Sequence, residues 1–154
     1  MAWSASKIFV AFIEDALENT DAKNIVSDTH KAALYDNDIT PDNTVTTANT
    51  VYNAGQWSAA GNEVADGTEW DAAGEPLTGV TFAPTAAVLK FDAADTPSGG
   101  SSATLANVFG CLVYDDTVVD RGLCYNYFGG TNSVTDGTFT IVWNAAGIFT
   151  LTLT

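Results

Sequence analysis

Few side chains in this chain of 154 residues could carry chemistry, and their spacing matches no common catalytic or metal site. The single histidine, His30, stands between Thr29 and Lys31, with no thiol close to it in the sequence. Zinc sites combine several nitrogen or sulfur ligands, and a serine-type triad needs a serine paired with its histidine, so we expect neither. We interpret His30 as a surface or rim histidine at the start of a strand.

Aspartates form three close pairs, which are Asp36 with Asp38, Asp92 with Asp95, and Asp115 with Asp116. Calcium loops add a glycine and a distal glutamate to such alternate carboxylates, and residues 36–38 lack both. Glycosidase carboxylates meet only in three dimensions, but aspartates within turn signals match strand-borne catalytic acids poorly. Because aspartate in a turn bonds its own backbone, we interpret all three pairs as turn formers. We therefore expect no enzymatic activity, no cofactor and no metal.

The two cysteines, Cys111 and Cys124, lie on apolar runs joined by a turn at residues 115–120. A hairpin that pairs Tyr114 with Arg121 places Cys111 opposite Cys124, with Cβ atoms about 4.5–5.5 Å apart. A disulfide would then need only a small adjustment. The alternative, favoured in a reducing cytoplasm, is a pair of buried thiols that pack as small hydrophobic groups.

The elements that must position these residues begin with a helix predicted over residues 4–18, capped by Ser4 or Ser6. Apolar side chains recur there at helical spacing, at Ile8, Phe9, Phe12, Ile13 and Leu17. So short a helix must dock its apolar face on a sheet or on another subunit. We treat residues 1–22 as an N-terminal unit and residues 23–154 as one domain.

The rest of the chain reads as strands divided by turn residues, which predicts a mainly β protein: an antiparallel β-sandwich with one N-terminal amphipathic helix. The Gly129-Gly130 pair predicts another turn, because no lysine or helix follows it as in a phosphate-binding loop. The last strand alternates, with Phe149, Leu151 and Leu153 predicted to be buried. The expected strands are residues 31–35, 77–82, 86–91, 105–114, 122–128, 138–143 and 148–153.

A long irregular excursion interrupts these strands at residues 43–75 and carries Tyr52, Trp57 and Trp70. We expect it to be ordered, since three free aromatic side chains would be a liability. Trp57 and Trp70 are candidates for glycan contact, and packing in the core is the alternative.

The central hairpin is apolar on both faces in the register given above. One face carries Val108, Leu112, Leu123, Tyr125 and Tyr127, and the other carries Phe109, Cys111, Val113, Cys124 and Phe128. Such a pair needs a second sheet on one face and another cover on the opposite face, from the same chain or from a neighbouring copy. The interface candidates are therefore Ile8, Phe9, Phe12, Ile13, Phe109, Val113 and Phe128.

The charge composition makes two classes of partner, nucleic acid and anionic membranes, poor candidates. With 19 acidic and 5 basic residues the formal net charge is −14, which repels nucleic acid and anionic lipid. Hydrophobic residues make up 46% of the chain, too many for intrinsic disorder. The apolar run at residues 8–13 is too short for a secretory signal or a membrane span, so we expect a soluble protein that is not exported.

Several motifs resemble those of small virion structural proteins of tailed bacteriophages, mainly of actinobacterial hosts. They are a strand ending in Leu34-Tyr35 before a turn with Pro41, a Leu77-Thr78-Gly79-Val80 strand, a strand closing on Tyr114-Asp115-Asp116-Thr117, Phe128-Gly129-Gly130, and a threonine-rich hairpin at 138–143. The resemblance spans most of the chain and rests on turn and strand signatures.

The resemblance implies a virion component assembled in the host cytoplasm. Capsid decoration is the preferred role, with the major capsid protein and copies of the chain itself as partners, as a dimer or trimer. A tail-associated or head-fibre protein that binds host glycans is the alternative.

Overall fold

The computed structural model describes residues 3–19 and 23–154, and the part of the chain that it describes is mainly antiparallel β-structure with a helix near the N-terminus, which confirms the predicted fold class. In chain order the elements are β1 (Lys7–Ile8), α1 (Val10–Glu18), β2 (His30–Tyr35), the 3₁₀ turns η1 (Thr47–Asn49) and η2 (Gly55–Trp57), β3 (Glu75–Pro76), β4 (Thr81–Thr85), β5 (Val88–Asp92), β6 (Thr96–Pro97), β7 (Ala103–Asp115), β8 (Arg121–Gly137), β9 (Thr140–Ile141) and β10 (Phe149–Thr152).

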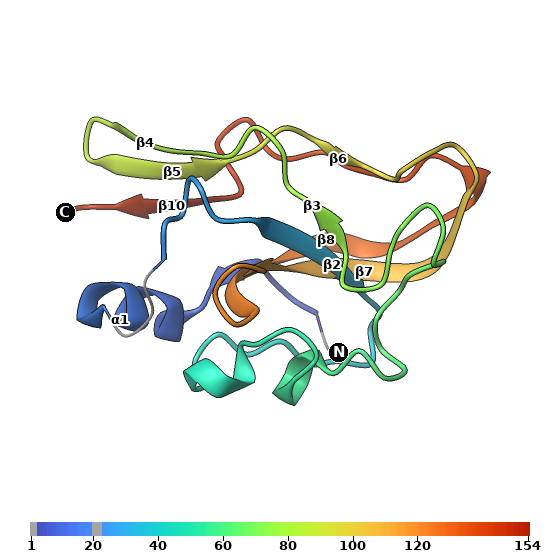
Figure 1. The fold of residues 1–154 in the computed structure, drawn as a ribbon, viewed down its shortest axis with the longest axis horizontal. Coiled ribbons are helices and arrows are strands. Elements are labelled where there is room, and N and C mark those ends of the chain that lie inside the picture. Colours follow the sequence, from blue (N-terminus) through green and yellow to red (C-terminus); the bar gives the residue numbers. More distant parts are fainter. Residues whose placement is uncertain (1–2, 20–22) are drawn as a thin grey trace.

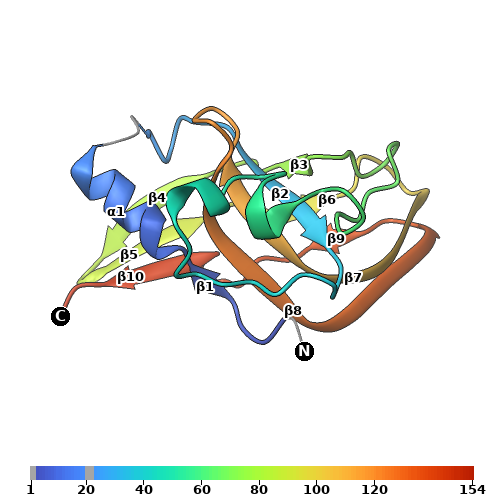
Figure 2. The ribbon, with the colours of Figure 1, turned by 90° about the horizontal axis from the view of Figure 1, so that it is seen from below.

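The strands form three sheets arranged in two layers (Figure 1). A five-stranded sheet in the order β1-β8-β7-β2-β3 is the central layer. The sheets β10-β5-β4 and β6-β9 lie on one of its faces, above it in Figure 1. The opposite face, seen from below in Figure 2, carries the two 3₁₀ turns, and α1 lies beside them, past the β1 edge of the sheet and against β10. The central sheet is thus covered on both sides by the same chain.

The longest strands, β7 and β8, form a ribbon that runs from the middle of the molecule to the end opposite α1 (Figure 2). Register shifts interrupt the pairing at several points, and Asn107 on β7 has a φ of 59°. Gly129 and Gly130, with φ of 82° and 156°, lie inside β8. The predicted turn at Gly129-Gly130 is therefore wrong. Glycine with positive φ bends a strand without ending it, because it has no Cβ to clash with the backbone.

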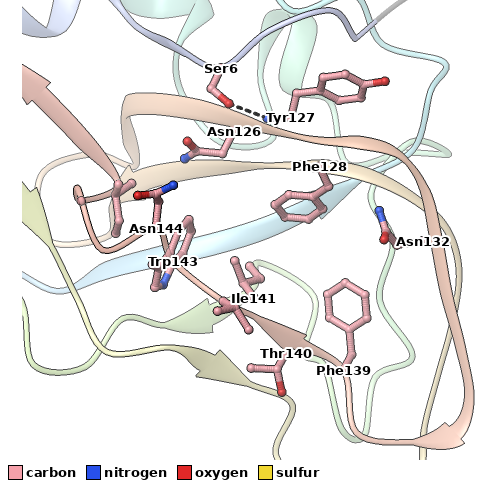
Figure 3. Close-up of a pocket in the computed structure, with 13 residues that line it drawn as sticks. Ser6, Asn126, Tyr127, Phe128, Asn132, Phe139, Thr140, Ile141, Trp143 and Asn144 are labelled. Atoms are coloured by element: carbon pink, nitrogen blue, oxygen red, sulfur yellow. Dashed lines mark hydrogen bonds between the residues drawn. The ribbon is translucent and has the colours of Figure 1, made fainter.

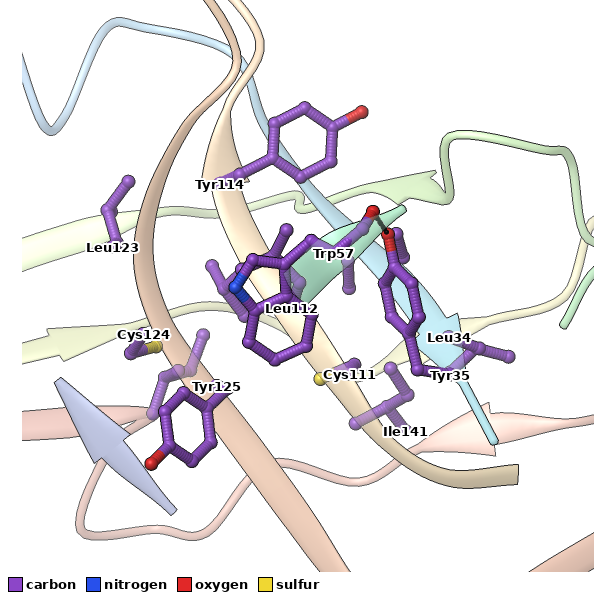
Figure 4. Packing of buried hydrophobic residues seen from close by; sticks show 14 of the residues in the cluster. Leu34, Tyr35, Trp57, Cys111, Leu112, Tyr114, Leu123, Cys124, Tyr125 and Ile141 are labelled. Carbon is purple, nitrogen blue, oxygen red and sulfur yellow. Dashed lines mark hydrogen bonds between the residues drawn. The ribbon is translucent and has the colours of Figure 1, made fainter. Parts of the chain in front are cut away.

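The predicted pairing of the two cysteines is also wrong. The turn pairs Asp115, not Tyr114, with Arg121, and a bulge between Tyr114 and Val113 adds a second one-residue shift, so Val113 faces Cys124 and Cys111 faces Asn126. Residues that are diagonal by two positions lie about 7–8 Å apart, beyond easy disulfide reach. Both thiols are free and buried (Figure 4). Burial raises the pKa of both, that of Cys124 to about 12, so they remain protonated packing groups.

On the lower face, aromatic side chains from distant segments cover the ribbon. The ring centroids of Trp3 and Phe9 lie 5.9 Å and 5.6 Å from that of Tyr125. Trp57 packs 5.2 Å from Tyr35, whose hydroxyl donates a 2.7 Å hydrogen bond to the Trp57 carbonyl oxygen. A Cβ at Gly110 would lie 2.6 Å from the Trp3 ring, so a glycine on β7 is what admits this indole.

On the upper face, the second layer supplies the cover. Phe91 of β5 packs edge to face on His30 of β2, with ring centroids 5.5 Å apart. Phe91 also stacks on Phe149 of β10 at 5.0 Å, and Ile141 of β9 is buried in the same core cluster. The prediction that both faces of the hairpin are buried is confirmed, and a second copy is not needed to cover either face.

The helix is shorter than predicted. It begins at Val10, while Lys7 and Ile8 pair with β8 and the Phe9 N–H donates to the Leu123 carbonyl at 3.0 Å. The β-branched Ile8 favours the extended backbone that makes these sheet bonds possible. Neither serine caps the helix: its N-cap is Phe9, which makes no side-chain cap hydrogen bond, and the Ser6 hydroxyl accepts from the Tyr127 N–H instead. Residues 1, 2 and 20–22 of the predicted N-terminal unit lie outside the described residues.

The strands predicted after residue 76 are present, but several are shorter than predicted or begin a few residues later. The predicted pair at residues 77–82 and 86–91 exists as the hairpin β4–β5, and β10 pairs with β5. Phe149 is buried as predicted, but Leu151 is only half-buried and Leu153 is 68% exposed. The apolar alternation of the sequence therefore extends beyond the part of β10 whose side chains the rest of the protein covers.

The excursion at residues 43–75 is held by polar side chains. The Asp66 carboxylate accepts hydrogen bonds from the backbone N–H groups of residues 68, 69 and 70 and, through Oδ2, of Thr104 on β7. Desolvation opposes its ionisation, but these N–H donors lower the pKa of Asp66 below its usual value. Glu63 accepts from the Tyr52 hydroxyl at 2.7 Å and from the Ala73 N–H at 2.7 Å. The excursion is ordered without long regular elements.

Candidate functional site

His30 is not a surface residue, contrary to the sequence-based interpretation. Its side chain is 1% exposed in total and its Nε2 lies 4.0 Å from Oδ2 of Asp115, which is also buried. Both imidazole nitrogens and Asp115 Oδ2 have no hydrogen-bond partner among the described residues. Desolvation by burial lowers the pKa of His30 and raises that of Asp115, although each attracts the charged form of the other. His30 and Asp115 therefore form a buried polar pair between the two layers, and solvent does not reach either side chain.

The aspartate pairs mostly bond nearby backbone, in agreement with their interpretation as turn formers. Asp36 Oδ1 accepts from the Asp38 N–H at 2.9 Å, and Asp115 Oδ1 accepts from two N–H groups of its turn at 3.0 Å. Asp95 instead accepts from the Trp143 N–H at 3.0 Å, across 48 residues of sequence. In the described residues, no group of three or more His, Cys, Asp or Glu side chains could hold a metal ion.

The predicted interface residues divide between core and surface. Phe9, Phe12 and Val113 are buried in the core. Ile8, Ile13, Phe109 and Phe128 are half-buried and pack against the core from its edge. The structure therefore does not bring the seven residues together on one surface.

Trp57 and Trp70 are both 0% exposed, so the predicted glycan contact through these two side chains is wrong. Trp57 fills the space between the excursion and the ribbon (Figure 4). Trp70 packs edge to face on Phe139, with centroids 5.6 Å apart. Both indoles complete the core, as the packing alternative required.

An apolar surface depression lies between α1 and the end of β10, and we name it the α1–β10 patch. It encloses about 540 Å³ and is lined by Ile8, Phe9, Val10, Ile13, Glu14, Leu17 and Leu151. Val10 and Leu17 are 56% and 82% exposed. Glu14 is its one charged member, although the chain carries a net charge of −14. An exposed apolar surface of this kind is one that a partner protein can cover.

A second and larger hollow lies where β8 passes the segment 139–148, and we name it the asparagine groove (Figure 3). Its volume is about 630 Å³. Its walls combine half-buried aromatic rings with carboxamides from β8 and from the segment 139–148. The principal side chains are Asn126, Phe128, Asn132, Phe139, Trp143 and Asn144.

Sequence reasoning identified Phe128 alone among these six residues, and only as an interface candidate. A signal existed in the adjacency of asparagine and aromatic residues, at 126–128 and at 143–144. Such dipeptides are also common in ordinary turns and strands, so they become informative only when the fold brings them together.

No helix within residues 3–19 and 23–154 is long and apolar enough to cross a membrane. Comparison with known proteins adds no assignment: no protein-family model matches the chain, and no curated protein or solved structure is significantly similar to it.

Proposed function

We propose that this protein is a structural component of a tailed-bacteriophage virion that decorates the outer capsid surface and stabilises contacts between capsomers. The motifs at residues 34–41, 77–80, 114–117 and 128–130, with the threonine-rich hairpin, support this setting by their resemblance to small virion proteins. The single observation that carries the proposal is the α1–β10 patch, which offers an apolar contact surface on an otherwise highly charged subunit.

The partner that fits this surface is the major capsid protein. A shell presents the same site many times, so a small subunit with one modest contact is retained if its neighbours on the shell also touch. The strong negative charge keeps crowded copies soluble and keeps DNA from adhering to them. In this proposal, copies of this chain contact one another on the shell through surface residues only. The core of each copy is complete without a partner, so these contacts are not needed for folding.

Copy number tests the assignment directly. We expect quantified gels or mass spectrometry of purified virions to find many tens of copies or more of this chain per particle. A handful of copies would overturn decoration and favour the tail-associated or head-fibre alternative. Absence from the particle would overturn both.

A surface variant tests the patch. Leu17→Asp places a charge in the patch at a side chain that is 82% exposed, so folding is retained while binding of the purified protein to undecorated particles falls at least tenfold. Val142→Asp is the matched control, because Val142 is 72% exposed and lines the asparagine groove instead. Equal binding by both variants would show that the patch is not the attachment surface.

A further inference from the structure

We propose that the asparagine groove binds a neutral carbohydrate, a property that does not depend on the virion role. The groove lies between the bent part of β8 and the segment 139–148 (Figure 3). A volume of about 630 Å³ is within the usual size of small-ligand sites and accommodates a short oligosaccharide.

The charge of the groove selects the class of ligand. The chain has 19 acidic and 5 basic residues, yet none of the residues that line the groove is charged. Asp95 and Lys90 adjoin the lining residues Trp143 and Gly147 but are engaged with the Trp143 N–H and with Asp92, so a charged ligand would find no available counter-charge among the described residues of the groove wall. A neutral ligand is the remaining class.

Two asparagine carboxamides of the groove have donor or acceptor atoms that could bond a ligand. Asn132 donates through Nδ2 to the Gly130 carbonyl at 3.0 Å, which orients its Oδ1 as a free acceptor with respect to the described residues. Asn144 accepts through Oδ1 from the Ala146 N–H at 2.8 Å and keeps its Nδ2 as a donor. A sugar hydroxyl both donates and accepts, so it can satisfy groups of either kind.

The aromatic rings are held in place before any ligand arrives. Trp143 donates its Nε1–H to Thr96 Oγ1 at 3.1 Å and its backbone N–H to Asp95 at 3.0 Å. Phe139 is fixed by its contact with the buried Trp70. Rings that are already ordered lose little entropy when they bind. One face of a sugar ring carries mainly C–H groups, which pack on such rings while its hydroxyls reach the carboxamides.

The side chains converge on one space. In Figure 3, Phe128 from β8 and Phe139 lie on facing sides of the hollow, with Asn132 toward one end and Asn144 toward the other. Apolar walls with a few polar groups around them are the usual composition of a ligand site. The juxtaposition of three carboxamides and three rings, with no charge, distinguishes this hollow from the apolar α1–β10 patch.

The test is an NMR titration of the full chain, labelled with ¹⁵N, against a panel of neutral trisaccharides: maltotriose, cellotriose, xylotriose, mannotriose and tri-N-acetylchitotriose. We expect at least one to shift the side-chain amide signals of Asn132 and Asn144 and the indole signal of Trp143 saturably, with a Kd of about 0.1 to 5 mM. The absence of saturable shifts with every trisaccharide at about 20 mM would overturn the proposal. Tighter binding of the acidic trisaccharide sialyllactose would overturn the requirement for a neutral ligand.

Variants locate the binding. Asn132→Ala removes an exposed carboxamide and should weaken binding of the best trisaccharide about tenfold. Phe128→Ala should weaken it further, while Phe109→Ala, which removes a half-buried ring outside the groove, and Asn49→Ala should leave it unchanged. If Phe128→Ala fails to fold, Asn132→Ala alone decides. Binding that Asn132→Ala leaves at full strength would place the ligand elsewhere and overturn the assignment.

Discussion

Val119 occupies a backbone conformation that its side chain disfavours. Its φ is +50°, in the left-handed region, at the tip of the β7–β8 hairpin, and its side chain is 67% exposed. A β-branched residue pays a steric cost there of about 1–2 kcal/mol that burial does not offset. We expect Val119→Gly to raise the free energy of unfolding by about 1 kcal/mol in urea titrations.

Val118 provides the matched control, because it precedes Val119 in the same turn and its φ is not positive. Val118→Gly should lower the free energy of unfolding by about 0.5–1 kcal/mol, since glycine there only adds freedom to the unfolded chain. Equal changes in the free energy of unfolding for the two substitutions would show that the positive φ of Val119 does not destabilise the folded protein.

The buried His30 predicts a specific dependence of stability on pH. Because burial lowers the pKa of folded His30 below its ordinary value of 6.5, the unfolded chain takes up the proton first as the pH falls. The free energy of unfolding therefore decreases below about pH 6.5, by up to about 1.4 kcal/mol at pH 5.5. Asp115 and Asp28 oppose this shift electrostatically but do not reverse it.

His30→Phe isolates this effect, because it keeps a ring against Phe91 and does not titrate. Urea unfolding at about pH 7.5 and pH 5.5 should show that the wild type loses more stability than the variant over this range. Parallel losses in the two proteins would mean that His30 is protonated as readily in the folded chain as in the unfolded one.

At the scale of elements, α1 is attached by one face only. Phe12 is 7% exposed and packs edge to face on Phe149 of β10 at 6.0 Å, whereas Leu17 is 82% exposed. Phe12→Ala should lower the free energy of unfolding by about 3–5 kcal/mol. Leu17→Ala, on the same helix, should change it by less than about 0.5 kcal/mol. A large effect of Leu17→Ala on the isolated protein would indicate that the helix docks by a different face.

The β7–β8 ribbon shows that the apolar pattern of a strand predicts its burial better than it predicts which residues pair across the two strands. Apolar residues on both faces of the hairpin predicted two covers, and both exist. The cysteine pairing failed because the turn pairs Asp115 with Arg121, which shifts the register by one residue, and a bulge at Val113 shifts it by one more. A bulge depends on how a strand bends around the rest of the core, and local sequence carries little trace of it.

For the whole molecule, the completeness of the core predicts a fold that does not depend on association. Trp3, Phe9 and Trp57 cover one face of the central sheet and the second layer covers the other, all from one chain. The thermal midpoint should therefore stay constant over a roughly hundredfold range of protein concentration. Light scattering on the same samples gives the mass. A midpoint that rises with concentration would show that a neighbouring copy completes the fold.

The sequence by itself determined the fold class and the paired apolar faces of the ribbon, since both follow from periodicity, which is a local property. The turn aspartate Asp36 is another example, because its carboxylate bonds the nearby backbone as its local pattern requires.

Tertiary structure decided where each aromatic side chain points and which polar groups meet. Trp57, in a polar stretch, is buried because the excursion folds back on the ribbon, while Leu17, in an apolar stretch, is exposed because α1 lies at the edge of the molecule. Asn132 and Asn144 share one groove although 12 residues separate them. Such contacts depend on the path of the chain in three dimensions, which spacing along one strand or helix does not encode.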